Sequence, residues 1–334
     1  MNREQQSILV TGGTGYLGGD ILAEIREDSR YDDVAIYATV RNKSLWPNFE
    51  AIRIIPVELD LGSPQDLDAF IRERHVKLVI ETTDSATDNI AIPCIKALQA
   101  NNGTYIALLL YQFQSNGTKQ WSMFAGFDPE KALYDDDPDF LPTVRRSVVK
   151  ADSYPVWLKT AASATENMLS LGEELGVGVH VVAPCLVHGP SRSLGNPLSI
   201  QVPALVKIAS KMGKLFTFSD DRDGGKQEWT QCHIRDTTAL YKLIIDKTFS
   251  NETIESGVYF AENGFFEWKR LYGLVTDVLG LPNALAEPSQ EDVNQMAEIL
   301  SVRPDEVAAQ ISGRQVLPCD LDRSDRGTAN YRDL

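Results

Sequence analysis

Three glycines spaced three residues apart follow a short apolar run near the N-terminus. Gly12, Gly15 and Gly18 stand between the apolar residues 7–10 and residues 16–26, whose apolar side chains recur at helical spacing. This spacing permits a tight turn, close approach of a ligand to the backbone, and close packing of helix on strand. Because backbone N–H groups at the start of a helix attract anions, we predict a strand, loop and helix that hold a pyrophosphate, rather than a plain glycine-rich turn.

Strand-like and helical segments alternate through the first half of the chain. Strands are predicted at 7–10, 34–40, 52–57, 77–81, 104–110 and 177–183, and helices at 16–26, from 63, at 90–100 and at 161–175. Strands that are apolar along their whole length are typical of a parallel sheet covered on both faces. We therefore predict an α/β fold: a Rossmann-type doubly wound parallel sheet with a smaller, mostly helical C-terminal substrate domain.

The second half of the chain shows mainly helical patterns. Helices are predicted at 202–211, 236–247, 268–279, 291–300 and 304–311, with a late strand at 258–261. Residues 112–153 show no sustained period and are predicted to form a functional or partly mobile loop. We expect a dinucleotide-binding domain at 1–190, a substrate-binding region at 191–316 to which the sheet returns near 230–262, and a disordered tail at 317–334.

The composition excludes several classes of partner. The formal net charge is −15, and an acidic chain repels nucleic-acid backbones and anionic lipid surfaces. No apolar stretch reaches the roughly 18–20 residues that span a bilayer, and the polar N-terminus leads straight into a strand. The four cysteines form no CxxC pair, which is typical of reduced thiols and not of a disulfide framework or metal site. We expect a cytoplasmic protein that binds neither nucleic acid nor membrane, as a monomer or a dimer.

The end of the second predicted strand bears on which dinucleotide is bound. Sites that prefer NAD usually place a carboxylate there, and that carboxylate would repel a 2′-phosphate. This chain has Arg41 instead, followed by Asn42 and Lys43. Because a guanidinium pairs well with phosphate, we predict NADP(H) as the cofactor; the alternative is that Arg41 only solvates the end of the strand.

Further residues complete the predicted cofactor site. Asp60 could accept a hydrogen bond from the adenine amino group, with Leu61 against the ring, although Asp60 could equally cap the following turn. The predicted cofactor-binding residues up to this point in the chain, with two threonines that follow the fourth strand, are Gly12, Thr14, Gly15, Tyr16, Leu17, Arg41, Asn42, Lys43, Asp60, Leu61, Thr82 and Thr83.

The sequence resembles the extended short-chain dehydrogenase/reductase superfamily, in its epimerase/dehydratase-like and NmrA-like branches. The resemblance covers roughly residues 7–262 and rests on residues 11–18, on Asp60-Leu61, and on the run Ala-Pro-Cys-Leu-Val-His-Gly-Pro at 183–190. The last run is similar to the superfamily's R-P-x-x-V-Y-G-P. It implies that Pro184, Leu186 and Val187 line the nicotinamide. Several later segments look most like fungal members, some of which serve secondary metabolism.

The superfamily's catalytic residues do not carry over to this chain. Its Y-x-x-x-K pair needs a spacing of four residues, which keeps both side chains on one face of a helix. The local pair, Tyr154 and Lys159, is five residues apart, and the proline after Tyr154 disfavours helical geometry there. Counted back from the sixth strand, the two positions fall on Trp157 and Ala161, and residues 107–110 lack the usual Ser or Thr. All three members of the triad are absent from these positions.

Another group would then have to move the proton. The catalytic candidates near the nicotinamide end are Glu81, Asp84, Tyr111, Trp157, Lys159 and His188. A carboxyl group in this role needs a pKa raised by an apolar cleft, and the alternative for Glu81 and Asp84 is a structural cap at the strand end. His188 replaces a tyrosine of the superfamily's motif and could donate a proton at neutral pH. Lys159 could still reach the ribose hydroxyls.

The leading hypothesis is an NADP-dependent enzyme that acts on a small apolar molecule. It would transfer hydride, for which an imine or iminium substrate would be well suited, or catalyse an isomerisation or cyclisation in which hydride is borrowed and returned. The residues expected near the substrate, unless they form a packed core, are Tyr111, Trp157, Leu194, Phe216 and Trp229. The alternatives are an NmrA-like sensor that binds NADP without turnover and a sugar-nucleotide epimerase or dehydratase, against which Arg41 and Trp157 weigh.

Overall fold

The computed structural model describes residues 6–83, 87–108, 156–218, 228–282 and 287–312, together with residues 135, 137, 139, 140, 142 and 143. The predicted loop at 112–153 lies almost wholly outside these residues, and the predicted tail at 317–334 lies outside them entirely. Within the described ranges, no helix combines the length and the apolar content needed to cross a membrane.

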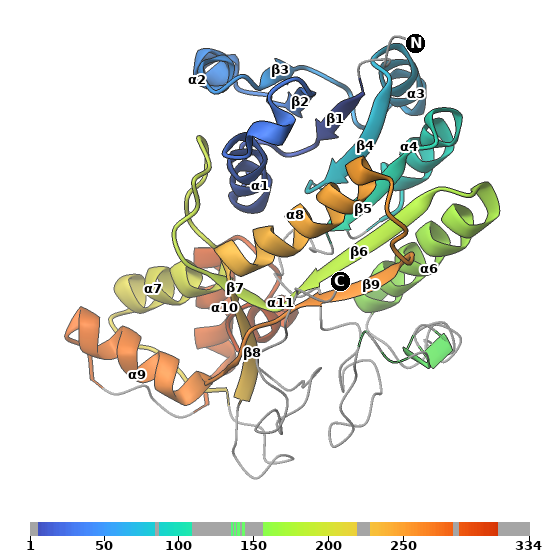
Figure 1. Cartoon of the computed structure of the whole chain (residues 1–334). Coiled ribbons are helices and arrows are strands. Elements are labelled where there is room, and N and C mark those ends of the chain that lie inside the picture. Colours follow the sequence, from blue (N-terminus) through green and yellow to red (C-terminus); the bar gives the residue numbers. More distant parts are fainter. Residues whose placement is uncertain are drawn as a thin grey trace.

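Seven parallel strands form the central sheet, in the order β3-β2-β1-β4-β5-β6-β9 (Figure 1). Their bounds are β1 Ser7–Val10, β2 Ala35–Thr39, β3 Ile55–Val57, β4 Val76–Glu81, β5 Thr104–Leu108, β6 Gly178–Pro184 and β9 Gly257–Ala261. The order of the strands reverses between β1 and β4, and ligands of open α/β sheets bind beyond the carboxyl ends of the strands at such a reversal. The predicted Rossmann-type parallel sheet is confirmed.

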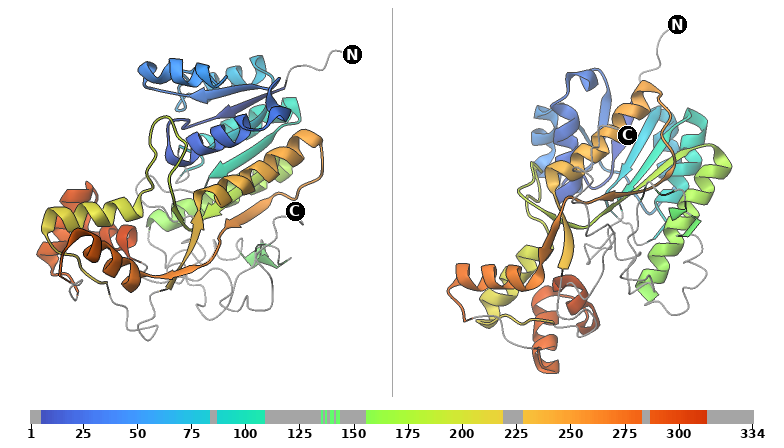
Figure 2. Two further views of the ribbon diagram at one scale, coloured as in Figure 1. Left: turned by 60° about the vertical axis from the view of Figure 1, so that its left-hand side comes forward. Right: turned by 60° about the horizontal axis from the view of Figure 1, so that its bottom comes forward.

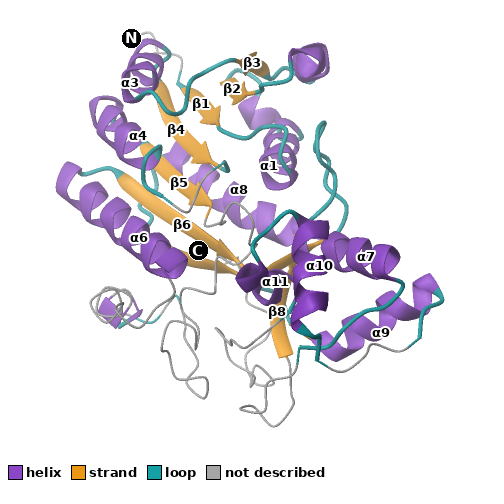
Figure 3. Ribbon diagram, turned by 180° about the vertical axis from the view of Figure 1, so that it is seen from behind, coloured by secondary structure: helices purple, strands orange, loops and turns teal. Residues whose placement is uncertain are grey.

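Helices cover both faces of this sheet. On one face lie α1 (Tyr16–Arg26) and α8 (Ile234–Ser250), and on the other lie α3 (Pro64–Glu73), α4 (Ala91–Leu98) and α6 (Val156–Leu175) (Figures 1 and 3). In β1, Ile8 and Val10 pack with α1 and α8, whereas Leu9 packs with α3, α4 and α6. Since successive side chains of a strand point to opposite faces, burial on both faces explains why the whole strand is apolar.

A smaller sheet and four helices gather at one end of the large sheet (Figure 2). The strands β7 (Leu186–His188), β8 (Glu228–His233) and β10 (Phe265–Glu267) pair in the order β10-β8-β7. The helices are α7 (Gln201–Met212), α9 (Trp268–Leu279), α10 (Gln290–Leu300) and α11 (Pro304–Ile311). They share a separate apolar core, in which Trp229 and Trp268 are almost completely buried.

Most predicted elements have bounds within a few residues of those found, because their signals are local. Ser63 caps α3 by accepting from the N–H of Asp66 (3.2 Å), and Ser289 caps α10 in a capping box. The strand predicted from residue 52 was wrong at its start: α2 (Trp46–Ala51) precedes it, and Arg53 makes a left-handed turn (φ 62°) before β3. Three-residue 3-10 helices at Ser29–Tyr31, Lys43–Leu45 and Gln99–Asn101 complete the described elements.

Further differences lie in the later part of the chain. The strands β7, β8 and β10 were not predicted, and α6 is already helical at Val156, five residues before the predicted start. Helix α8 begins at Ile234 and not at residue 236, with His233 as its N-cap.

Candidate functional site

The glycine-rich loop after β1 has the shape of a phosphate-binding turn. Gly12 adopts a left-handed conformation (φ 70°), which explains why glycine stands there. Its N–H donates to Thr39 Oγ1 at the end of β2 (2.9 Å), and its carbonyl accepts from the N–H of Gly15 (2.8 Å). Helix α1 then starts with no side-chain cap and no acidic residue in its first turn, so this part of the chain leaves the first N–H groups of the helix to a ligand.

Glycine is also required because the backbone passes close to its neighbours. A Cβ at Gly18 would lie 2.5 Å from Gly12 O and 2.5 Å from Thr82 Oγ1, and a Cβ at Gly15 would lie 3.0 Å from Gly12 O. Any side chain at Gly18 would therefore push α1 away from the end of β1. The close contact of helix and strand keeps the cradle for an anion open, as the glycine spacing predicts.

The ends of β1 and β4 are joined by three threonines. Thr11 Oγ1 accepts from the N–H of Thr82 (3.1 Å), and the hydroxyl of Thr82 donates to Thr11 O (2.5 Å). Thr83 Oγ1 lies 3.1 Å from Thr11 Oγ1. The structure therefore brings Thr82 and Thr83, two of the predicted cofactor-binding residues, to the edge of the glycine-rich loop.

Arg41 is the available cation at the end of β2. It is exposed, and within the described part of the chain its side chain makes no hydrogen bond or ion pair. Lys43, in contrast, pairs with Glu58 (2.5 Å) and lies over the ring of Trp46. Asn42 accepts from the N–H of Ser44 (3.1 Å) and so caps the short helix that follows. Of the three residues predicted at this position, Arg41 is the one whose side chain is left to a ligand.

The structure places Asp60 and Leu61 after β3 with local partners. Asp60 Oδ1 accepts from the N–H of Gly62 (2.9 Å), so this carboxylate caps the following turn, which was the structural alternative in the prediction. Leu61 is partly buried against the core under α3, α4 and α6. A role for either residue at the adenine stays a prediction.

A segment that we call the strap, residues 189–198, rises from β7 to the glycine-rich loop and returns to α7 (Figures 1 and 2). Tyr16 donates its hydroxyl to Gly189 O (2.7 Å), and burial raises the pKa of Tyr16 and keeps it protonated. Asn196 donates its backbone N–H to Thr14 O (2.9 Å). Thus Thr14 and Tyr16, both predicted to bind the cofactor, also hold the strap beside the loop.

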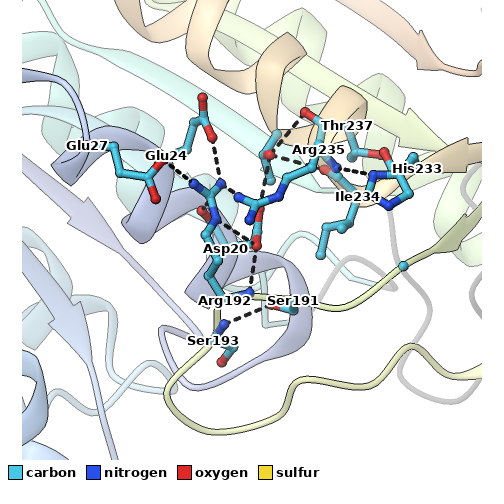
Figure 4. Close-up of polar contacts among 12 residues, drawn as sticks. Asp20, Glu24, Glu27, Ser191, Arg192, Ser193, His233, Ile234, Arg235 and Thr237 are labelled. Carbon is cyan, nitrogen blue, oxygen red and sulfur yellow. Dashed lines mark hydrogen bonds and ion pairs between the residues drawn. The ribbon is translucent and has the colours of Figure 1, made fainter.

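Arg192 fastens the strap to α1 (Figure 4). Its guanidinium lies 2.9 Å from Asp20 and 2.6 Å from Glu24, both on α1, and 2.6 Å from Glu27, the C-cap of that helix. Asp20 is fully buried and also receives the hydroxyl of Thr238 on α8 (3.1 Å). The prediction missed this cluster, although one signal was present: Asp20 follows Leu17 and precedes Ile21 on the apolar side of the predicted helix.

A cleft of about 510 Å³ adjoins the strap, between the small sheet and helices α7 and α9. His188 of β7 lines it and is half-buried, one residue before Gly189, the partner of Tyr16. Burial and, second, the neighbouring His233 lower the pKa of His188, against the opposing effect of Asp236. The rings of His188 and His233 meet edge-on with their centroids 5.3 Å apart. His188 is therefore neutral at pH 7 and able to accept a proton or donate its one N–H.

The residues of the resembling run 183–190 reach different places. Pro184 pairs with Ala261 at the end of β6 and is buried. The side chain of Leu186 lines the cleft, whereas that of Val187 packs into the core beneath α1 and α8. Only Leu186 of these three therefore shares the cleft with His188.

Glu81 is buried away from the cleft. It ends β4, is 2% exposed, and accepts the hydroxyl of Tyr105 on β5. Tyr105 belongs to the core under α3, α4 and α6. These contacts favour the structural alternative for Glu81 over a role in catalysis.

The other catalytic candidates yield less. Asp84 and Tyr111 lie outside the described residues, and Trp157 and Lys159 lie on α6, where only their backbone is described.

Of the residues expected near an apolar substrate, Phe216 and Trp229 are buried in the core of the C-terminal helices, so the packed-core alternative holds for both. Leu194 lies on the strap and is 37% exposed. Three cysteines, Cys94, Cys185 and Cys232, are buried and form no disulfide with one another, and the described residues contain no cluster of three metal-ligating side chains.

Solved structures share this fold at low sequence identity. A dTDP-glucose 4,6-dehydratase from Bacillus anthracis matches with a TM-score of 0.58 and 15% identity over 91% of this chain and 93% of that chain. A UDP-glucose 4-epimerase from Thermotoga maritima matches with a TM-score of 0.56 and 12% identity, over 92% of this chain and 97% of that chain. Vestitone reductase from alfalfa matches with a TM-score of 0.55 and 17% identity, over 83% of each chain. No protein-family model and no curated protein sequence matches the chain. The likenesses show that the chain has the Rossmann-type α/β fold of these proteins.

Proposed function

We propose that this protein is an NADP(H)-dependent enzyme that acts on a small apolar molecule. The observation that carries the proposal is the uncapped start of α1 behind a left-handed Gly12, with Arg41, which pairs with no other described residue, at the end of the neighbouring strand. A pyrophosphate fits the start of α1, because the N–H groups at the start of a helix bind anions. A 2′-phosphate fits Arg41, because a guanidinium can donate hydrogen bonds to two phosphate oxygens at once.

The likeness to known folds supports the dinucleotide. The Bacillus anthracis dehydratase and a Thermus thermophilus UDP-glucose 4-epimerase were both solved with NAD. Their fold, with the resemblance at residues 11–18 and 183–190, supports a place among extended short-chain dehydrogenases/reductases, as an NmrA-like member that lacks the Ser-Tyr-Lys triad. We infer further that it is a cytoplasmic enzyme of fungal secondary metabolism.

In the proposed site, the chain's own residues orient the cofactor and move a proton. The first turn of α1 binds the pyrophosphate, Thr82 and Thr83 border it, and Arg41 selects the phosphorylated ribose. The bound cofactor would supply hydride-transfer chemistry at its nicotinamide. His188, neutral in the cleft, accepts the proton of a substrate hydroxyl or returns it in the reverse direction. In an isomerisation or cyclisation, His188 would first accept the proton and then return it.

Sugar nucleotides, which the names of several structural neighbours mention, suit this cleft poorly. A nucleotide diphosphate carries two or more negative charges and needs several cations or backbone donors. The residues that line the cleft include a single arginine and mostly apolar side chains. A small apolar substrate is the better match.

The second candidate function is an NmrA-like sensor that binds NADP(H) and does not turn it over. What favours it is the absence of the tyrosine and lysine from the positions where the resemblance would place them, at Trp157 and Ala161. Ala161 itself is buried on α6.

The test is calorimetric titration of the purified protein with NADP⁺, NADPH, NAD⁺ and NADH, followed by a substrate screen at the nicotinamide absorbance. We expect both phosphorylated forms to bind more tightly than their counterparts, and at least one apolar carbonyl, imine or alcohol to be turned over. Preference for one redox state without turnover would favour the sensor. If none of the four dinucleotides binds, both proposals fail.

A further inference from the structure

Within the described residues, the cleft beside the strap has an apolar wall that is only partly covered. The wall is formed by Leu186, Val202, Phe265, Phe266, Leu271 and Leu274. Leu274 remains 54% exposed on α9. Exposed apolar side chains that line a concave surface of this size are typical of a small-molecule site.

Three polar side chains enter this apolar surface. His188 and Gln231 come from the neighbouring strands β7 and β8, and both are half-buried. Arg270 extends from the second residue after the start of α9 and is exposed. None of the three side chains makes a hydrogen bond or an ion pair with another described residue. A few convergent polar groups on an apolar surface fix the orientation of a ligand.

The cleft lining carries one charge of each sign. Arg270 is the single permanent cation among the lining residues, and Glu267, three residues before it, is the single carboxylate. His188 is neutral at pH 7 and Gln231 is neutral at any pH. One guanidinium matches one carboxylate in a bidentate pair, and Glu267 repels a second negative charge.

We propose that this cleft binds an aromatic or alkyl monocarboxylate, with its hydrocarbon part on the apolar wall and its carboxylate on Arg270. His188 and Gln231 then hydrogen-bond a polar group further along the ligand. The inference deepens the proposed function, because it names the class of substrate that the same enzyme would take. It does not depend on that function for its test, since binding to the cleft is measured without turnover.

The experiment compares three probes with the same phenylpropyl skeleton by calorimetry at neutral pH: 3-phenylpropanoate, its amide 3-phenylpropanamide, and 3-phenylpropylamine. The full-length protein is used with and without NADP⁺. We expect the carboxylate to bind at least about tenfold more tightly than the amide, the gain of a charge-assisted pair at a partly hydrated site. Arg270→Gln should abolish this preference and leave the affinity for the amide unchanged.

Lys269→Gln is the matched control, because Lys269 is the adjacent exposed cation of α9 and does not line the cleft. It should keep the full preference for the carboxylate. The proposal is overturned if acid and amide bind the wild-type protein equally, if the preference survives in Arg270→Gln, if the amine binds most tightly, or if no probe binds. NADP⁺ titrated against each variant separates the two ideas: its failure to bind refutes the proposed function and leaves the result for the cleft intact.

Discussion

Arg192 of the strap places its guanidinium 2.9 Å from the carboxylate of Asp20, a side chain with no exposed surface in the middle of α1. The backbone N–H of Arg192 donates to the same carboxylate (2.8 Å). Arg235, at the start of α8, lies further off at 3.7 Å. One buried charge thus joins three segments that are far apart in the sequence: helix α1 of the glycine-rich loop, the strap, and α8.

Replacing Arg192 by Met should therefore destabilise the whole protein. The change leaves Asp20 buried with the backbone N–H of residue 192, the Thr238 hydroxyl and the more distant Arg235, and breaking a buried pair costs about 3–5 kcal/mol. Urea unfolding measures the loss. Arg72→Met is the control, because its pair with Asp68 on α3 is about half exposed and contributes at most ~0.5 kcal/mol. Equal stability of the two variants would show that Asp20 has no need of Arg192.

Gly18→Ala should damage the dinucleotide site. The new Cβ would meet Gly12 O and Thr82 Oγ1, each at 2.5 Å, and Gly12 O belongs to backbone that cannot move without opening the turn. We expect NADP⁺ affinity to fall by at least about a hundredfold, since the phosphate cradle must shift. Gly273→Ala in α9 is the matched control: nothing lies within 4 Å of its Cβ, so it should raise stability by about 0.5–1 kcal/mol and leave binding unchanged.

Arg41→Glu tests the choice between the two dinucleotides. A bidentate contact with the 2′-phosphate would become a repulsion, so NADP⁺ binding should weaken by about 2–4 kcal/mol while NAD⁺ binding is little changed or improved. Calorimetry with both dinucleotides measures the ratio. Arg72→Glu makes the same change of charge on the opposite face of the sheet and should leave the ratio unaltered. An unchanged affinity of Arg41→Glu for NADP⁺ would remove the basis for a phosphorylated cofactor.

Some elements of this fold can be predicted from short stretches of sequence, whereas others depend on contacts between distant segments. The strands of the large sheet are mainly apolar, and Ser63 and Ser289 mark helix starts that the structure reproduces. The strands β7 and β10 have three residues each, and their pairing with β8 is set by contacts distant in sequence, so no local period reveals them.

The same limit applies to the site. Gly12, Gly15 and Gly18 lie within seven consecutive residues, so their pattern could be recognised in the sequence. Gln231 and Arg270 line the same cleft only because β8 pairs with β10. Aromatic residues gave the weakest prediction, because Trp229 fills a core with the same side chain that could line a cleft.

His180 should give the protein a measurable dependence of stability on pH. Its ring is buried in β6, and burial lowers its pKa from 6.5 to about 4, with a smaller opposing effect from the carbonyl of Glu255. The unfolded chain therefore binds a proton between about pH 6.5 and pH 4 that the folded chain does not, so stability is full above pH 6.5 and falls as the pH drops through this window. At the acidic end of this pH window, His180 accounts for a loss of about 3 kcal/mol in the free energy of unfolding. His180→Phe should flatten this part of the curve of unfolding free energy against pH, measured by urea denaturation. If the variant keeps the full slope of the wild-type protein, the pH dependence belongs to other groups and not to His180.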